Sequence, residues 1–163
     1  MKNYPDYLRK QGAKIGRDCE IYKSANFQSE PYLISIGDHV RVNSGVQLVT
    51  HDGGVWVLRE AQSHFGDEFK QADRFGRIVI GNNVHIGTNA IIMPGVSIGN
   101  NCIVGCGSVV THNVSDNTIV AGVPAREIES IEEYAEKTRR ENYVNTKGMS
   151  REEKRHFLCN NLK

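Results

Sequence analysis

The fold is decided by residues 80–126, which read IGNNVHIGTNAIIMPGVSIGNNCIVGCGSVVTHNVSDNTIVAGVPAR. An aliphatic residue recurs here at every sixth position, and a glycine follows most members of the series. The members are Ile80, Ile86, Ile92, Ile98, Val104 and Val110. The residue four positions after each member is small or β-branched. Because a period of six suits neither one helix nor one flat strand, we interpret each hexad as a short strand followed by a corner.

This period predicts a parallel β-solenoid. Three hexads close a triangular coil of 18 residues, and each aliphatic residue points inward and stacks on its equivalent one coil away, about 4.8 Å along the axis. Glycine and asparagine near the corners allow the tight backbone. The same frame occurs earlier in the chain, at Ile15, Ile21, Phe27, Ile36, Val42 and Leu48.

Composition agrees with this interpretation and excludes several classes of protein. The 163 residues include only 6 Leu, against 30 Val plus Ile and 30 Gly plus Asn, which argues against a helical bundle. With 20 basic and 19 acidic residues, the chain lacks the basic footprint of a nucleic-acid-binding protein. We find no run of 18 apolar residues for a membrane span, and the first 14 residues lack the apolar core of a signal peptide.

The four cysteines show neither a CxxC pair nor zinc-ligand spacing. We therefore expect reduced thiols in a cytoplasmic protein, and no metal site. The charges are uneven, because residues 126–163 hold 17 of the 39 charged side chains. In that segment Ile128, Ile131 and Tyr134 share a helical face, and Ser150 with Glu153 forms a capping-box pattern.

These observations predict three parts. Residues 1–14 form an N-terminal arm, residues 15–125 form the β-helix with an inserted loop at 52–77, and residues 126–163 form a helical tail. Loops as long as 52–77 in a compact domain are usually functional or disordered.

Two interruptions of the frame point to the chemistry. The step from Phe27 to Ile36 is nine residues instead of six, and the step from Leu48 to Ile80 is 32. His51 lies three residues after Leu48, and Glu30 lies three after Phe27, one coil earlier. The register therefore predicts that the two side chains lie side by side. A neutral imidazole suits the role of general base, and a carboxylate on its other nitrogen fixes the tautomer.

The sequence strongly resembles the hexapeptide-repeat acyltransferases over residues 15–128, and its nearest look-alikes are sugar O-acetyltransferases of the galactoside, maltose and xenobiotic type. The resemblance implies a left-handed parallel β-helix of four to five coils with the C-terminal helical tail. It also implies a homotrimer with active sites between subunits. The sequence LVTH, which ends at His51, matches the position of the catalytic histidine in these enzymes. In the galactoside enzymes, an acidic residue close to the position of Glu30 lies by the acceptor site.

The resemblance further implies acetyl-CoA as the donor. Carried over by position, Thr88 and Cys106 contact the pantetheine arm, while Thr111, His112 and Arg126 lie near the nucleotide end. GVPAR, which ends at Arg126, matches the family pattern well.

The acceptor side is less defined. Trp56, the only tryptophan, is a candidate for stacking on a sugar ring, Arg59 for pairing with an acidic sugar or phosphate, and His85 for an active-site wall. We therefore expect O-acetylation of a sugar or of a polysaccharide or lipopolysaccharide precursor, with His51 as general base and Glu30 as its partner. The alternatives are N-acetylation of an amino sugar or xenobiotic, a γ-carbonic-anhydrase-like metalloenzyme, and a non-catalytic β-helix.

Overall fold

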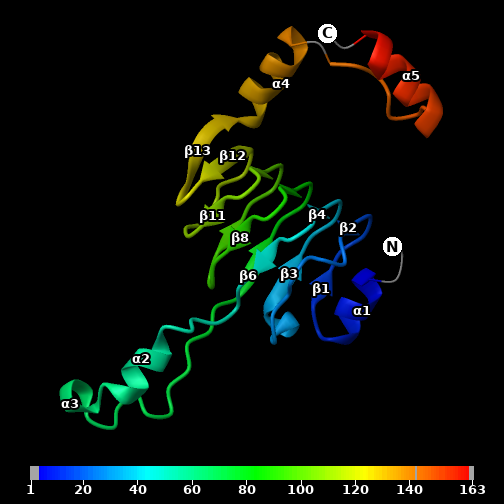
Figure 1. Cartoon of the computed structure of the whole chain (residues 1–163). Helices are drawn as coiled ribbons and strands as arrows, with labels where there is room; N and C mark the ends of the chain where they lie inside the picture. The colour runs from blue at the N-terminus through cyan, green and yellow to red at the C-terminus, as the bar shows by residue number, and fades with distance from the viewer. Residues whose placement is uncertain (1–3, 142, 162–163) are drawn as a thin grey trace. The chain divides into compact units, whose positions relative to one another are not determined.

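The computed structural model describes residues 4–141 and 143–161, and its main body is the predicted left-handed parallel β-helix, made of three sheets (Figure 1). One sheet contains β1 (Lys14–Ile15), β3 (Ile34–Ile36), β6 (Ile78–Ile80) and β9 (Ser97–Ile98). A second contains β2 (Glu20–Ile21), β4 (Arg41–Val42), β7 (His85–Ile86), β10 (Ile103–Val104), β12 (Thr118–Gly122) and β13 (Ala125–Ser130). The third contains β5 (Gln47–Leu48), β8 (Ile91–Ile92) and β11 (Val109–Val110).

The inward rows follow the frame that the sequence predicts. Strand pairing places each aliphatic residue beside its equivalent one coil away, in the rows Ile36–Ile80–Ile98, Val42–Ile86–Val104 and Leu48–Ile92–Val110. All nine side chains are buried in one continuous core. Full burial of such a side chain contributes about 1.5–3 kcal/mol, so the rows supply a large part of the driving force for folding.

The last coil departs from the frame. Val114 bridges to Ile98, and neighbouring residues of these segments are 16 positions apart instead of the 18 between the preceding coils. Val114 therefore occupies an inward row itself, although the six-residue spacing places it at the small position of the hexad that begins at Val110. The frame loses two residues where the corner after Val110 is shortened.

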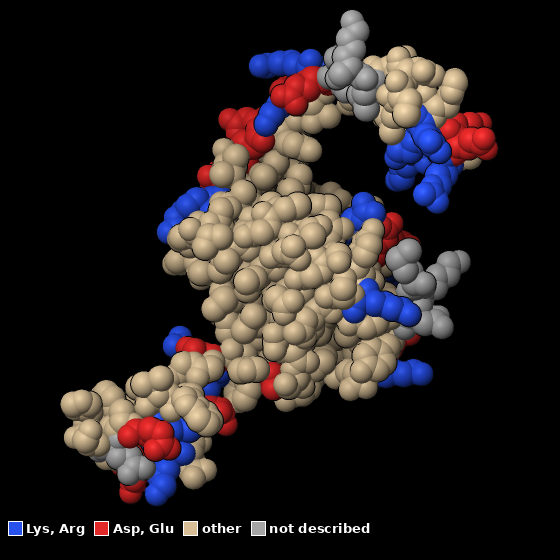
Figure 2. Space-filling model, viewed as in Figure 1, with Lys and Arg blue, Asp and Glu red and all other residues tan. Residues whose placement is uncertain are grey.

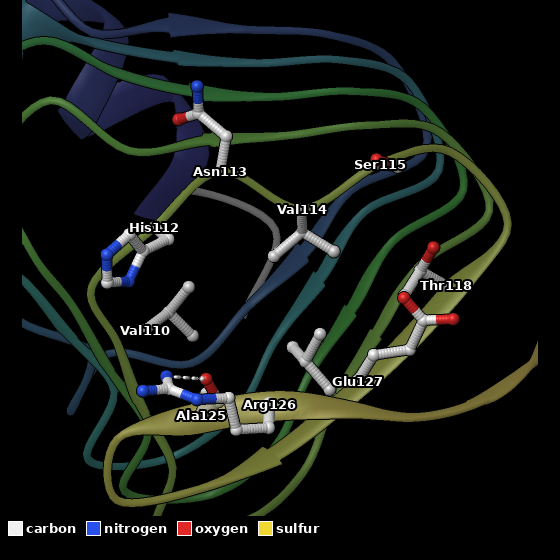
Figure 3. Close-up of a pocket in the computed structure, with 10 residues that line it drawn as sticks. Val110, His112, Asn113, Val114, Ser115, Thr118, Ala125, Arg126 and Glu127 are labelled. Carbon is white, nitrogen blue, oxygen red and sulfur yellow. Dashed lines mark hydrogen bonds between the residues drawn. The ribbon is translucent and has the colours of Figure 1, made fainter.

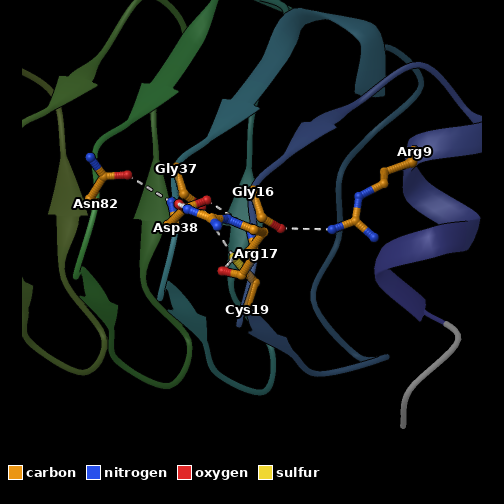
Figure 4. A network of polar contacts seen from close by, with 7 residues as sticks. All are labelled: Arg9, Gly16, Arg17, Cys19, Gly37, Asp38 and Asn82. Carbon is orange, nitrogen blue, oxygen red and sulfur yellow. Dashed lines mark hydrogen bonds and ion pairs between the residues drawn. The ribbon is translucent and has the colours of Figure 1, made fainter.

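Polar ladders hold the corners between the first two sheets (Figure 4). Asp38 Oδ1 accepts a hydrogen bond from the backbone N–H of Arg17 at 2.7 Å, and Asn82 Oδ1 accepts one from that of Asp38 at 2.8 Å. Each side chain thus satisfies a corner N–H of the preceding coil. Glycine serves close approach here, because a Cβ at Gly16 would lie 2.5 Å from the carbonyl oxygen of Gly37.

Both ends of the β-helix are covered. The N-terminal arm contains α1 (Tyr4–Lys10), which inserts Leu8 into the core, and Arg9 Nη2 donates to the carbonyl of Gly16 at 2.7 Å (Figure 4). At the other end, β13 pairs antiparallel with β12. This pairing corrects the prediction that the helical tail begins at residue 126. An unpaired β12 would expose a sheet edge, and the pairing overrides the helical spacing that includes Ile128.

Residues 132–163 form a second compact unit. Helix α4 (Ile131–Arg140) leads into it, and α5 (Arg151–Asn161) follows. The predicted capping box precedes α5, since Ser150 N–H donates to Glu153 Oε2 at 2.8 Å and Glu153 N–H donates to Ser150 Oγ at 3.3 Å. Within the described residues, no helix has both the length and the apolar character needed to cross a bilayer.

Candidate active site

The inserted loop leaves and re-enters the β-helix through a short antiparallel ribbon. His51 bridges Phe75, Asp52 N–H donates to the carbonyl of Arg74 at 2.8 Å, and Gly76 N–H donates to that of Thr50 at 2.9 Å. Beyond the ribbon lie α2 (Val55–Glu60) and α3 (Gln62–Phe65) (Figure 1). The ribbon therefore fixes the backbone of His51 at the root of the loop.

The second interruption brings Glu30 to the same corner. A short 3₁₀ helix, η1 (Pro31–Leu33), follows Glu30, whose carbonyl accepts a hydrogen bond from Leu33 N–H at 3.0 Å. The Glu30 side chain is 13% exposed, and its Oε2 lies 3.1 Å from His51 Nδ1. The same oxygen accepts the hydroxyl hydrogen bond of Thr50 at 2.6 Å. The juxtaposition of Glu30 and His51 that the register predicts is thus present.

The charge on Glu30 determines which nitrogen of neutral His51 carries the proton. The Thr50 hydrogen bond holds the pKa of the Glu30 carboxyl below its usual value, and the hydrogen bond and charge of His51 act in the same direction against burial. An ionised carboxylate only accepts hydrogen bonds. In neutral His51, Nδ1 therefore carries the proton, and Nε2 remains available to accept another.

His51 and Glu30 line a cavity of about 380 Å³ that also includes Trp56 and Arg59. We call it the His51 cavity. Trp56 lies on α2 and is 72% exposed, so its ring is accessible to a ligand. Arg59 differs from the expectation that it pairs with an anionic acceptor. Its guanidinium donates to the carbonyl of Ala72 and pairs with Asp73, so in this structure it braces the returning half of the loop.

Several residues that line the cavity were not predicted from the sequence, among them Asp52, Arg74 and Phe75. Asp52 and Arg74 form an ion pair with 3.3 Å between their charged atoms, and Phe75 meets the His51 ring edge-on, with 6.3 Å between centroids. The return of the chain next to its own departure point brings them together, and nothing in the repeat frame indicates that pairing. The sequence could have indicated Thr50, because its hydroxyl lies two positions after the inward Leu48 and directly before His51.

His85 lies outside the His51 cavity of the same chain. It projects from β7, where it pairs in register with Arg41 and Ile103, and its Nε2 lies 3.4 Å from Asn43 Nδ2. Burial lowers the pKa of the His85 imidazole, and the charge of Arg41 adds to the effect. Within one chain, the predicted wall residue and the predicted base therefore belong to different surfaces.

The residues expected to bind the donor fall into two groups. Thr88 and Cys106 are exposed on stacked corners, where Gly107 N–H donates to the carbonyl of Thr88 at 2.8 Å. Thr111 Oγ1 lies 2.8 Å from His112 Nδ1 on the shortened corner of the last coil. The two groups occupy different corners of the β-helix.

His112 and Arg126 line a second cavity of about 370 Å³, which we call the His112 cavity. Figure 3 shows both side chains at one end of it, with Thr118 and Glu127 at the other. Arg126 Nη1 donates to its neighbouring carbonyl, Ala125 O, at 2.8 Å. The structure thus brings together two of the five predicted donor-binding residues in one cavity.

Comparisons with known proteins add an independent line of information. Residues 77–112 match the family model described as bacterial transferase hexapeptide (six repeats). The chain is 49% identical to Protein CapG of Staphylococcus aureus, over 97% of this chain and 88% of that protein. It is 38% identical to galactoside O-acetyltransferase of Escherichia coli, over 72% of this chain but only 53% of the longer relative.

A solved structure is similar as well. The hexapeptide-repeat acetyltransferase VCA0836 of Vibrio cholerae, complexed with acetyl-CoA, matches 73% of this chain and 60% of its own chain, with 29% identity and a TM-score of 0.54. Fold, repeat and relatives thus agree with one another.

Proposed function

The chain belongs to the hexapeptide-repeat acetyltransferase family, and we propose that it moves an acetyl group from acetyl-CoA to a hydroxyl group of a saccharide. The observation that carries this proposal is the Glu30–His51 pair in a solvent-open cavity at the root of the loop. Because Glu30 engages Nδ1 of His51, Nε2 is left to accept a proton, as the base for a hydroxyl nucleophile must.

In the proposed reaction, Nε2 of His51 takes the proton of the acceptor hydroxyl while that oxygen attacks the thioester carbonyl carbon. A C–O bond forms, and the tetrahedral intermediate collapses with cleavage of the C–S bond. The proton on His51 passes to the departing sulfur, so the products are an acetyl ester and free CoA thiol. Glu30 holds Nδ1–H throughout and stabilises the imidazolium, as the orienting carboxylate of a triad does.

The donor is proposed to reach this site along the coils. Its pantetheine arm would pass Thr88 and Cys106, and its phosphates would bind near Thr111, His112 and Arg126. The acetyl-CoA complex of the Vibrio cholerae relative supports the choice of donor. A guanidinium suits phosphate recognition, which supports the role of Arg126.

We propose that the working unit is a homotrimer. In one chain His51 follows a strand of the third sheet, whereas Thr88 and Cys106 lie at the corner between the second and third sheets, so a site that uses both sets of residues would draw them from two copies. Residues 78–125 carry a single charged side chain, Asp116, and Figure 2 shows the middle of the β-helix face almost free of charge. Such a surface is inexpensive to bury against another copy. We also propose that the predicted wall residue, His85, reaches the site from a neighbouring chain.

On the acceptor side, Trp56 is the proposed platform for a sugar ring, since its exposed indole offers a flat apolar face beside the base. The galactoside specificity in the name of the Escherichia coli relative supports a saccharide. The four free thiols support a cytoplasmic setting, where acetyl-CoA is available.

An acceptor screen tests the proposal. The purified protein is incubated with acetyl-CoA and either neutral sugars, nucleotide sugars or amino sugars, and free CoA thiol is measured. NMR of the product then shows whether an ester or an amide has formed. Ester formation on a sugar supports the proposal; turnover restricted to amines, or no thiol release with any acceptor, contradicts it. Sedimentation in the same buffer reports whether the active species contains three chains.

A further inference from the structure

We propose that Thr50 is a positioning residue that holds the Glu30 carboxylate in place for His51, an inference that rests on the proposed function. Thr50 is fully buried at the end of the third sheet. Its Oγ1 donates to Glu30 Oε2 at 2.6 Å, and this oxygen is the one that His51 Nδ1 approaches to 3.1 Å. Base, carboxylate and hydroxyl therefore form one hydrogen-bonded line.

The backbone of Thr50 is itself held in place. Its carbonyl accepts a hydrogen bond from Gly76 N–H at 2.9 Å, where the loop re-enters the β-helix. Gly76 in turn is packed so closely on the next coil that a Cβ there would lie 2.3 Å from the nitrogen of Gly95. The hydroxyl of Thr50 thus projects from a rigid junction, whereas Glu30 belongs to a corner insertion with no strand of its own.

The physical effect follows from charge and burial. A hydrogen bond from a hydroxyl to a carboxylate is charge-assisted and strong, and the Glu30 side chain is only 13% exposed, so water replaces it poorly. The contact with Thr50 is also the largest cause of the lowered pKa of Glu30. Without this donor, the carboxylate takes up a proton more readily and is free to turn from the imidazole.

The closing experiment compares Thr50→Val, which keeps the shape and removes the donor, with Thr50→Ser, which keeps the donor. We expect Thr50→Val to lower kcat about tenfold, by analogy with the loss when an outer-shell partner of a metal-bound histidine is removed, with KM for acetyl-CoA within about twofold. Thr50→Ser should retain most of the kcat. Thr146→Val, a buried threonine in the C-terminal unit, is the matched control for the substitution. Unchanged kcat in Thr50→Val overturns the proposal.

A double variant separates positioning from general damage. If Thr50 acts through Glu30, adding Thr50→Val to Glu30→Ala lowers kcat by less than about twofold further. An equal loss in both backgrounds contradicts the proposal.

A second readout does not depend on acetyl transfer. The carboxyl ¹³C signal of Glu30, assigned by its absence in Glu30→Ala, should titrate at higher pH in Thr50→Val than in the unchanged protein. Identical titrations overturn the positioning role. If the unchanged protein releases no thiol with any acceptor, the proposed function fails, while this titration still decides whether Thr50 controls the carboxylate.

Discussion

Residues 78–125 and the loop at 52–77 differ in charge, in burial and in the partners of their side chains. The coiled segment has one charged side chain and contributes the stacked aliphatic rows. The loop has nine charged side chains and the only tryptophan, and its polar groups pair mostly within the loop, as Arg59 does with Asp73 and Arg74 with Asp52. The repeat therefore supplies stability and a rigid frame, while the places where the repeat is broken supply the candidate chemistry.

The largest effect is expected from a substitution in the buried rows of the β-helix, compared with one in the loop. Ile86 is fully buried between Val42 and Val104, and Ile86→Ala should lower the free energy of unfolding by about 2–5 kcal/mol. Trp56→Ala in the loop should change it by less than about 0.5 kcal/mol, because Trp56 is 72% exposed. Denaturant titration of both variants measures the contrast, and equal losses would refute the division of labour.

Next in size is the effect of removing Glu30. Glu30→Ala should lower kcat about 10- to 100-fold, because His51 loses the partner that orients it, while the melting temperature stays within a few degrees. Glu68→Ala, which changes an exposed glutamate of the inserted loop at 52–77, is the matched control. Steady-state kinetics with acetyl-CoA and the identified acceptor measure both. A Glu30→Ala enzyme as fast as its control would show that the pair is structural only.

A smaller effect is expected in the His112 cavity. Arg126→Ala should raise KM for acetyl-CoA about tenfold and leave kcat nearly unchanged, because a phosphate contact binds ground state and transition state alike. Arg151→Ala on α5 serves as the control. A fall in kcat with constant KM would place Arg126 outside donor binding.

The smallest effect concerns pH. The pKa of Glu30 is lowered in the folded protein, so its ionised form stabilises the fold at pH values above the pKa of an unfolded-state glutamate, and this contribution is lost as pH falls through the folded-state value. Glu30→Gln should therefore be less stable than the unchanged protein at neutral pH, and the difference should shrink on acidification. Urea titrations at several pH values measure it. A difference that grows towards low pH would reverse the assigned sign.

The sequence predicts those features of the structure that follow from the hexad period. The hexad period dictates the inward rows. The same register brings Glu30 to His51, since they lie three residues after Phe27 and Leu48, whose segments are aligned by the Asn26–Gln47 bridge. The period does not determine how segments outside the repeat pair in the folded chain. Thus Val114 occupies an inward row through a shortened corner, and residues 126–130 belong to β13 because the edge of β12 needed a partner. In the loop, the pairing of Arg59 depends on how the chain returns, and no local pattern encodes that.

The central claim is that the broken repeat places a general base at the loop root. The most direct test is His51→Ala beside His64→Ala, which changes an exposed histidine of the same loop. Both are measured for acetyl transfer and for thermal unfolding. The account predicts a loss of at least about 100-fold in kcat for His51→Ala, with an unchanged melting temperature, and ordinary turnover for His64→Ala. Ordinary turnover in His51→Ala would contradict it.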